Sequence, residues 1–395
     1  MHGAGTVSVL FVTMVPQTVV SMMSLTPPVM ADDVVATLGL PAGAAGFYTG
    51  LIYFFVLITN IVAAPLIARF GPLRLSFACI VLGGFGLALF GSGSIVGVLF
   101  ATTVIGLSYG PLTPASSQVL ATQSQSQAFA LLVSVRQTSV PLGGVLAGLL
   151  VPQLVLRLGW QSSCVALGLG TAVFAFVMAL SLPIIRKEQP AGRTRFSGGL
   201  LGPLRFITQR RDLLTLSAAS TIFGALQLVL SAFLVIYLVT VVGHDLVSAG
   251  ALLGLSQVSG VLGRILWGYV ADRVGSSRKL LGLVGVGMTL ACLATGLLSY
   301  TGPSWLAIPV VILFGATASG WNGVFLAEVM REVKPAEVGF ATSGSLMFTY
   351  FGVMVGPPLF GLAAAFVGFQ GAYALAAVLA LAGAYLAWRM RPEGS

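Results

Sequence analysis

The chain alternates between long apolar windows and short interruptions rich in polar residues, glycine and proline. A helix needs about 20 mostly apolar residues to cross a bilayer, and windows of that length predict twelve membrane-spanning helices. Their expected ranges are 8–30, 44–68, 73–91, 96–120, 127–152, 160–183, 213–242, 248–271, 279–300, 305–329, 339–366 and 371–388. The pattern therefore predicts an all-α integral membrane protein.

Composition supports this class and excludes others. Of the 395 residues, 57% are hydrophobic and 7% are charged, and the mean hydropathy is +1.01. Soluble domains carry about 25% charged residues, so soluble, disordered, collagen-like and disulfide-stapled folds are excluded. The longest polar stretch, 184–212, divides the windows into two sets of six. We expect two pseudo-symmetric six-helix bundles, 1–183 and 213–395, joined by a cytoplasmic linker over 184–212.

Lysine and arginine are distributed unevenly between the predicted spans. With the N-terminus in the cytoplasm, sixteen of the 19 basic residues fall in cytoplasmic segments. Because basic loops stay inside, we expect both termini in the cytoplasm and a location in the bacterial inner membrane. The net charge of +9 is then mainly an orientation signal, which argues against nucleic-acid binding. Within the basic linker, Leu200–Asp212 is compatible with an amphipathic helix that touches anionic lipid.

One loop motif occurs twice. The segment 268–279, between the eighth and ninth predicted spans, aligns at an offset of 204 residues with 64–74, between the second and third. In this alignment Arg273, Gly275 and Arg278 fall on Arg69, Gly71 and Arg74. A repeat of this kind is typical of transporters built from two parallel six-helix halves.

On this motif, and over its whole length, the chain resembles the major facilitator superfamily. The family's loop signature, G-x-x-x-D-R-x-G-x-x-[RK]-[RK], is matched at Gly268, Asp272, Arg273, Gly275, Arg278 and Lys279. The resemblance implies alternating-access transport and a gating role for this loop, whose acid faces a helix N-terminus that favours negative charge. The first copy has Ala68 at the acidic position, so it cannot provide the same latch. A tight basic turn without a gating role is the alternative interpretation.

Two arginines fall inside predicted spans. Arg264 lies eight residues before Asp272, about 12 Å along a helix, and Arg136 lies near the middle of the fifth span. A charge in hydrocarbon costs about 2.5–3.5 kcal/mol even on insertion scales, which makes both residues functional candidates. All ten acidic residues fall at or beyond span ends. Since arginine binds a carboxylate through two parallel hydrogen bonds, an anionic substrate is the expected counter-charge.

Structural roles are the alternative for both arginines. Arg264 would then pair with Glu328 or Asp272, and Arg136 would bond to Gln137 or to carbonyl groups freed near Pro141. Other polar or aromatic side chains complete the predicted substrate-binding set, and each one alone is also explained as a helix–helix contact or a core residue. They are Gln17, Tyr53, Tyr109, Gln137, Gln227, Gln257, Trp321, Asn322 and Tyr350.

The resemblance also bears on the substrate. The segment Arg264-Ile-Leu-Trp-Gly268 is similar to the Arg-x-x-x-Gly of the eighth span in monocarboxylate and oxalate/formate transporters, where that arginine contacts the substrate carboxylate. We therefore expect a secondary transporter of small organic anions, with a monocarboxylate favoured. Efflux of drugs or other amphipathic compounds is the alternative.

The coupling partner follows from what the spans lack. No carboxylate falls in mid-membrane, and Glu328, near the inner end of the tenth span, is the one candidate for a proton-carrying carboxylate, with a role in a charge relay or gate as the alternative. We expect anion exchange, uniport, or symport in which the substrate carboxylate helps to carry the proton. The three cysteines are single and apolar in context, and no metal or catalytic spacing occurs. We therefore expect a monomer that is no enzyme and has neither cofactor nor metal.

Overall fold

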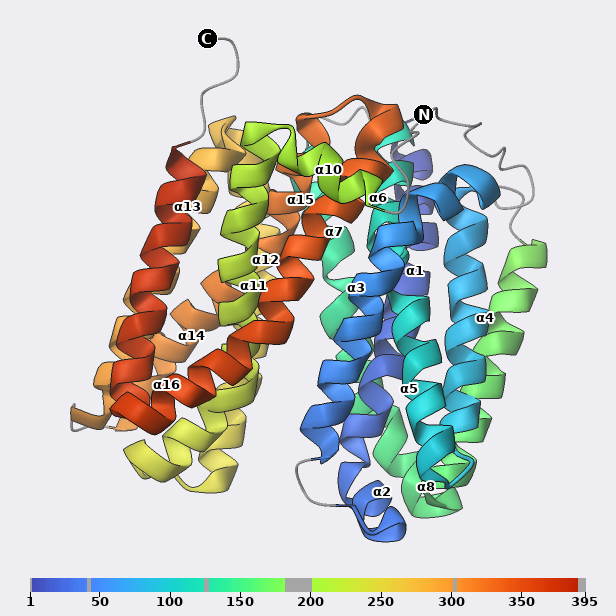
Figure 1. Ribbon diagram of the computed structural model, residues 1–395, viewed down its shortest axis with the longest axis horizontal. Helices are drawn as coiled ribbons and strands as arrows, with labels where there is room; N and C mark the ends of the chain where they lie inside the picture. The colour runs from blue at the N-terminus through green and yellow to red at the C-terminus, as the bar shows by residue number, and fades with distance from the viewer. Residues whose placement is uncertain (1, 41–43, 124–127, 182–200, 301–303, 390–395) are drawn as a thin grey trace. The chain divides into compact units, whose positions relative to one another are not determined.

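The structure, a computed structural model, describes residues 2–40, 44–123, 128–181, 201–300 and 304–389 of the 395. It is all-helical in these ranges (Figure 1). The first half contains α1 (His2–Val29), α2 (Ala31–Leu38), α3 (Ala44–Phe70), α4 (Pro72–Phe90), α5 (Ile95–Tyr109), α6 (Leu112–Gln123), α7 (Phe129–Gln137) and α8 (Ser139–Ser181).

The second half contains α10 (Gly202–Thr208), α11 (Arg211–Tyr237), which continues as a π-helical turn over Leu238–Val242, α12 (Leu246–Val274), α13 (Ser277–Leu297), α14 (Ala307–Ala318), α15 (Asn322–Arg331) and α16 (Val338–Trp388). Short 3₁₀ turns cover Leu298–Tyr300, Ser304–Leu306 and Pro335–Glu337. The expected amphipathic helix over Leu200–Asp212 is instead two elements, α10 and the start of α11. The rest of the predicted linker, 184–200, lies outside the described residues.

Ten stretches of the described chain are long and apolar enough to cross a membrane. Two of them, Phe129–Met178 and Pro335–Trp388, have 50 and 54 residues, enough for two crossings each. Both bend at a glycine with non-helical dihedral angles, Gly159 (φ 74°, ψ 162°) and Gly368 (φ 74°, ψ 169°). This region of φ and ψ is open essentially to glycine alone. In Figure 1 the two arms of α16 meet at its bend and diverge from it.

Three predicted spans are each built from two helices. The fourth is α5 and α6, the fifth is α7 with the first arm of α8, and the tenth is α14 and α15. Proline explains the first two breaks, because it has no N–H for the carbonyl four residues before it. Pro111 follows the end of α5, and Pro141 lies in the first turn of α8.

The chain forms two compact units that exchange short segments. Unit 1 comprises 1–124, 138–205 and 333–344, and unit 2 comprises 125–137, 206–332 and 345–395. Thus α7 belongs to unit 2 although it lies in the first half of the sequence, and the first turns of α16 belong to unit 1. The exchange in span five occurs at the break between α7 and α8.

Glycines allow close helix packing inside each unit. In unit 1, a Cβ on Gly106 of α5 would lie 2.8 Å from the carbonyl oxygen of Ile52 in α3. In unit 2, a Cβ on Gly356 of α16 would lie 2.6 Å from the Cβ of Ala225 in α11. Small residues at such positions let backbones approach within lipid.

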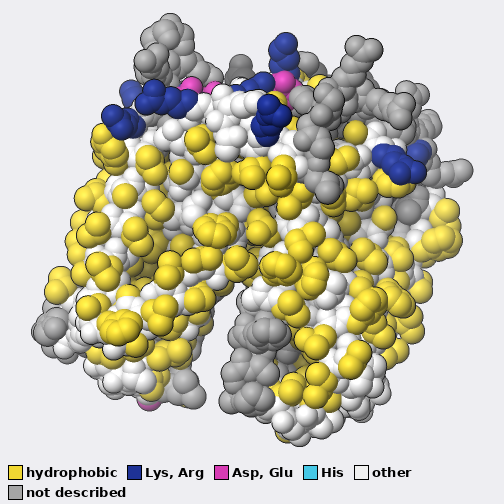
Figure 2. All heavy atoms as spheres, in the orientation of Figure 1, with side chains coloured by type: hydrophobic (Ala, Val, Ile, Leu, Met, Phe, Trp, Pro, Cys, Tyr) yellow, Lys and Arg dark blue, Asp and Glu magenta, His cyan; other side chains and the backbone are white. Residues whose placement is uncertain are grey.

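The surface of each unit is divided by chemistry. Figure 2 shows apolar side chains over the lateral faces and Lys and Arg side chains at one end of the helices. In unit 2, the last turns of α12 and α15 and the first turn of α13 carry Arg273, Arg331 and Arg278, and this end of the unit is called the basic end. In unit 1, Arg69 lies in the last turn of α3 and Arg74 in the first turn of α4. The protein is a multi-pass membrane protein.

Candidate functional site

The helix α7 lies along α12 and is also packed against α15. The Asp272 carboxylate accepts hydrogen bonds from the backbone N–H groups of Ala130 (3.0 Å) and Leu131 (2.8 Å). These N–H groups lie in the first turn of α7, where a helix offers them no acceptor. Arg331 of α15 donates to the same carboxylate at 3.0 Å. Asp272 therefore joins the N-terminus of α7 to the basic end of α15.

Gly268 lies one turn before Asp272 on α12 and faces the middle of α7. A Cβ at this position would lie 2.5 Å from Oγ of Ser134 and 3.0 Å from the carbonyl oxygen of Ala130. Gly323 of α15 is equally close to Ser134, with 2.6 Å from an added Cβ to the serine Cβ. The glycine of the loop motif is thus a contact surface for α7.

Arg264 lies one further turn before Gly268 and is buried, with 5% of its surface exposed. Its Nε donates to the carbonyl oxygen of Ser319 at 2.8 Å, and its Nη1 donates to the carbonyl oxygen of Gln137 at 2.5 Å. Both carbonyls stand at the C-terminal ends of half-helices, α14 and α7. These ends carry partial negative charge, which offsets part of the cost of burying the guanidinium.

Arg136 is fully buried and points to the same place. Its Nη2 donates to Oε1 of Gln137, so the two guanidinium groups meet on one residue, Arg264 at its backbone and Arg136 at its amide. Residues 127 positions apart are brought together at the break in span five. The bond from Arg136 to Gln137 is also the contact that the structural interpretation of Arg136 predicts.

The acidic residues nearby engage other cations. Arg278 donates to Glu328 at 2.6 Å and also pairs with Glu332. Arg331 binds Asp272 and, at 2.9 Å, the hydroxyl of Ser277. Glu328 is buried, with 6% of its surface exposed. Glu328 and Asp272 therefore have cationic partners other than Arg264, namely Arg278 and Arg331. The structural interpretation that pairs Arg264 with one of these two acids is not needed to account for their positions.

Several other predicted residues of unit 2 pair with each other or lie in its core. The Asn322 amide donates to Oε1 of Gln227 at 2.9 Å, and the amide of Gln257 donates to Ser231 at 3.4 Å. Trp321 is fully buried between Phe223 and Phe325, and Tyr350 is 9% exposed. Arg273 is exposed and stacks over Tyr269, and Gly275 ends α12 in a left-handed conformation.

In unit 1, Gln17 accepts a hydrogen bond from Thr113 of α6 at 3.2 Å and donates to Ser21 at 3.4 Å. Tyr53 is half-buried on α3, and Tyr109 is buried at the end of α5. The hydrogen bond between Gln17 and Thr113 joins α1 to the start of α6, next to the break between α5 and α6.

Sequence reasoning missed Gln118 of α6. Its Nε2 donates to the carbonyl oxygen of Pro335 at 2.6 Å, and its Oε1 accepts from the N–H of Gly339 at 2.8 Å. Gly339 is in the first turn of α16, so this amide binds an N-terminal N–H group of α16 within unit 1. The available signal was a glutamine near the end of the fourth predicted span, 96–120, on the half whose loop motif has no acid.

Asn60 of α3 was also not in the predicted set. It is fully buried, and among the described residues its side-chain nitrogen and oxygen have no hydrogen-bond partner. Its backbone carbonyl accepts a hydrogen bond from Ser343.

Comparison with known proteins assigns the family. The family model described as Major Facilitator Superfamily matches residues 9–343. The chain belongs to this superfamily. Its members are transporters and not enzymes, in agreement with the repeated loop motif.

Relatives within the superfamily are distant and differ in their names. An uncharacterized MFS-type transporter of Mycobacterium tuberculosis is 25% identical over 73% of this chain, and the match covers 64% of that protein. An MFS-type efflux pump of Mycolicibacterium smegmatis is 26% identical over 85% of this chain and 79% of its own length. The hexuronate transporter of Bacillus subtilis is 25% identical over 81% of this chain and 83% of its own length.

A solved structure supports the fold. The crystal structure of the MFS transporter FucP in the outward conformation superposes with a TM-score of 0.79 and 15% identity, covering 98% of this chain and 100% of that one. At this identity the likeness concerns the fold alone.

Proposed function

We propose that this MFS transporter carries small organic anions with a carboxylate group, favouring monocarboxylates, and that Arg264 and Arg136 bind the anion. The observation that carries the proposal is the meeting of two buried guanidinium groups on Gln137, at a break in a membrane-spanning helix. Two positive charges that converge on one residue repel each other, and an anion bound to both reduces that cost.

The chemistry of the site favours a carboxylate. Hydrogen bonds between a guanidinium and a carboxylate are about twice as strong as bonds between neutral groups. The hexuronate carried by the Bacillus subtilis relative is itself a monocarboxylate with hydroxyl groups. The amide pair Asn322–Gln227 provides further polar groups in the same unit for the rest of such a substrate. The proposed binding set is completed by the remaining polar and aromatic candidates, Gln17, Tyr53, Tyr109, Gln257, Trp321 and Tyr350.

The rest of the transport cycle follows from the same chemistry. We assign six residues to a gate at the basic end: Gly268, Asp272, Arg273, Gly275, Arg278 and Glu328. We propose that this end and both chain termini face the cytoplasm, with the protein in a bacterial inner membrane. The described spans contain no mid-membrane carboxylate to carry a proton. A counter-anion, or a proton carried with the substrate carboxylate, is therefore the proposed coupling partner. We propose that the protein transports as a monomer.

The test is counterflow in proteoliposomes. Vesicles are loaded with unlabelled D-galacturonate or L-lactate, and uptake of the same labelled anion is measured, with the lipophilic cation tetraphenylphosphonium as a parallel substrate. We expect counterflow of at least one carboxylate, and its loss in Arg264→Ala. The matched control is Arg211→Gln, which removes an exposed charge at the start of α11 in the same unit.

Two results contradict the proposal. Counterflow of the cation without either carboxylate refutes anion transport. Normal carboxylate counterflow in a folded Arg264→Ala protein returns Arg264 to a purely structural role. Size-exclusion profiles and thermal unfolding of each variant separate loss of transport from loss of fold.

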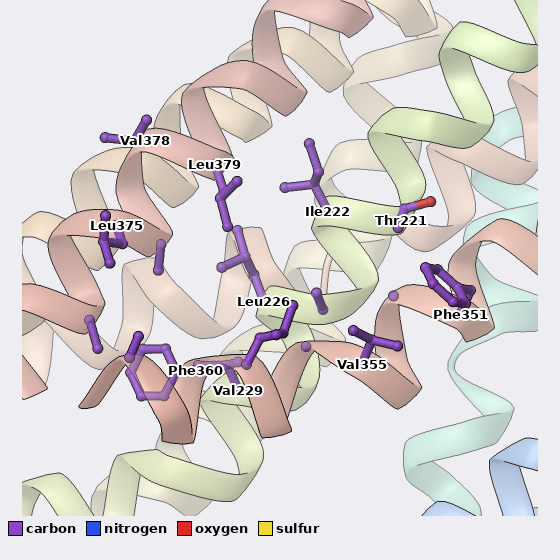
Figure 3. A pocket seen from close by; sticks show the side chains of 17 residues that line it. Thr221, Ile222, Leu226, Val229, Phe351, Val355, Phe360, Leu375, Val378 and Leu379 are labelled. Carbon is purple, nitrogen blue, oxygen red and sulfur yellow. The ribbon is translucent and has the colours of Figure 1, made fainter. Parts of the chain in front are cut away.

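Efflux of amphipathic compounds is the second candidate, and one feature of unit 2 favours it. A cavity of about 470 Å³ lies between α11 and the two arms of α16 (Figure 3). Its lining is apolar except for the side chain of Thr221, and includes Ile222, Leu226, Phe351 and Phe360. Pockets of this size and character take drug-sized apolar ligands, and one relative is named an efflux pump. Binding of tetraphenylphosphonium that is weakened by Leu226→Arg and unaffected by Arg264→Ala would support this candidate.

A further inference from the structure

The helix α7 is held at both ends by charges from one neighbouring helix. Asp272 of α12 binds the N-terminal N–H groups of α7, and Arg264 of α12 binds the carbonyl of Gln137, its last residue. Between them, Gly268 lets the two helices touch at Ser134. All of these residues belong to unit 2.

The lengths of the two segments match. The nine residues of α7 and the nine residues 264–272 of α12 each extend about 12 Å from the first Cα to the last. The signs match as well, because a helix carries partial positive charge at its N-terminus and partial negative charge at its C-terminus. A carboxylate thus faces the positive end of α7, and a guanidinium faces the negative end.

The C-terminal contact depends on the sequence of α8. In a continuous helix, the carbonyl of Gln137 would accept the N–H of residue 141, but this residue is Pro141, which has none. Arg264 takes the place of the missing donor. The next residue along the chain, Thr138, belongs to unit 1, so this bond holds the last residue of unit 2 before the chain passes into unit 1.

We propose that Arg264 makes this clamp responsive to the substrate: a carboxylate that binds Arg264 replaces the carbonyl of Gln137 and so releases the C-terminal end of α7. This inference rests on the proposed function. The exchange is favourable because the ionised carboxylate is a stronger acceptor than a neutral carbonyl. Asp272 keeps the N-terminal end in place, so the binding of an anion loosens one end of α7 and leaves the other bound. Arg264 then links occupancy of the binding site to the gate at the basic end.

Hydrogen–deuterium exchange of the full-length protein in lipid nanodiscs tests the clamp. Without ligand, Arg264→Gln is expected to raise the exchange rate of the amides of Val133–Gln137 by on the order of tenfold, the size of a partly buried helix-terminus contact. Asp272→Asn is expected to act at Ala130 and Leu131 instead. The control Arg211→Gln changes neither group. Equal exchange in Arg264→Gln and the wild-type protein overturns the proposal.

The response to ligand is measured with D-galacturonate and L-lactate, whose binding is followed separately by thermal shift. A bound carboxylate is expected to raise the exchange of Val133–Gln137 in the wild-type protein and to leave Arg264→Gln unchanged. A purely structural Arg264 predicts no such change. If a carboxylate binds and these amides stay as protected as before, the substrate response is wrong while the proposed function stands. If neither carboxylate binds, the proposed function fails and the substrate response fails with it, whereas the ligand-free comparison still decides whether the clamp exists.

Discussion

Replacing Gln118 by alanine removes a contact that unit 1 makes with the first turn of α16. The glutamine is 7% exposed and spans two backbone groups, the carbonyl of Pro335 and the N–H of Gly339. The N–H of Gly339 is buried and lies where a helix provides no acceptor of its own. Alanine therefore leaves it without a partner and weakens the attachment of segment 333–344 to α6.

The expected cost is about 2 kcal/mol. Each neutral hydrogen bond contributes about 1 kcal/mol, and a buried group left unpaired costs about 1–3 kcal/mol. A change of about 2 kcal/mol corresponds to roughly a 30-fold increase in the population in which segment 333–344 is detached. Gln118→Glu keeps the acceptor for Gly339 but loses the donor for Pro335, so we expect an intermediate effect.

Cysteine labelling measures this population. Ala341 lies in the same segment and is fully buried, and the three native cysteines are buried as well, so Ala341→Cys provides a site whose labelling requires opening. We expect maleimide to label it roughly ten to thirty times faster in the Gln118→Ala background. Thr122→Ala, one turn along α6, is the matched control. A labelling rate within twofold of the parent would refute the role of Gln118 in holding segment 333–344 against α6.

Two further predictions concern unit 2. Gly268→Ala places a Cβ 2.5 Å from Oγ of Ser134, and overpacking of this kind costs about 1–3 kcal/mol. The unfolding temperature should therefore fall by several degrees, and Ser134→Gly in the same protein should restore it. An unchanged unfolding temperature in Gly268→Ala would show that the two helices lie further apart. Hydrogen bonds from the side chain and backbone of Ser248 lower the pKa of Asp245, the N-cap of α12, below its ordinary value of 3.8. The stabilisation by this carboxylate is thus present above pH 3.8 and is lost as the pH falls through the lowered pKa. Asp245→Ala should therefore unfold at a lower temperature at pH 7, and the difference from wild type should shrink in acid; a difference independent of pH would contradict this.

The sequence predicted the membrane spans well because each needs only a local property, a sufficient length of apolar residues. The predicted start and end of the third span, 73–91, differ by one residue from α4. The sequence analysis did not predict that the fourth, fifth and tenth spans are each broken into two helices. Pro141 was visible, but the position of the break and the partner of the freed carbonyl depend on Arg264, which is 127 residues away.

The candidate site was predicted in part. The presence of two arginines inside spans follows from their positions within the apolar windows, and the structure brings both onto Gln137. The role of Gln118 was missed because its partners, Pro335 and Gly339, are more than 200 residues distant.

The exchange of segments between units has a consequence for biosynthesis. Ala130 precedes Asp272 by 142 residues. At about 5–20 residues per second, a ribosome adds the carboxylate roughly 7 to 28 seconds after it has made the helix that this carboxylate binds. During this interval α7, with the charge of Arg136, has been synthesised and α12 has not. The first half of the chain therefore cannot complete its own packing as it emerges, and its last step waits for the second half to be inserted.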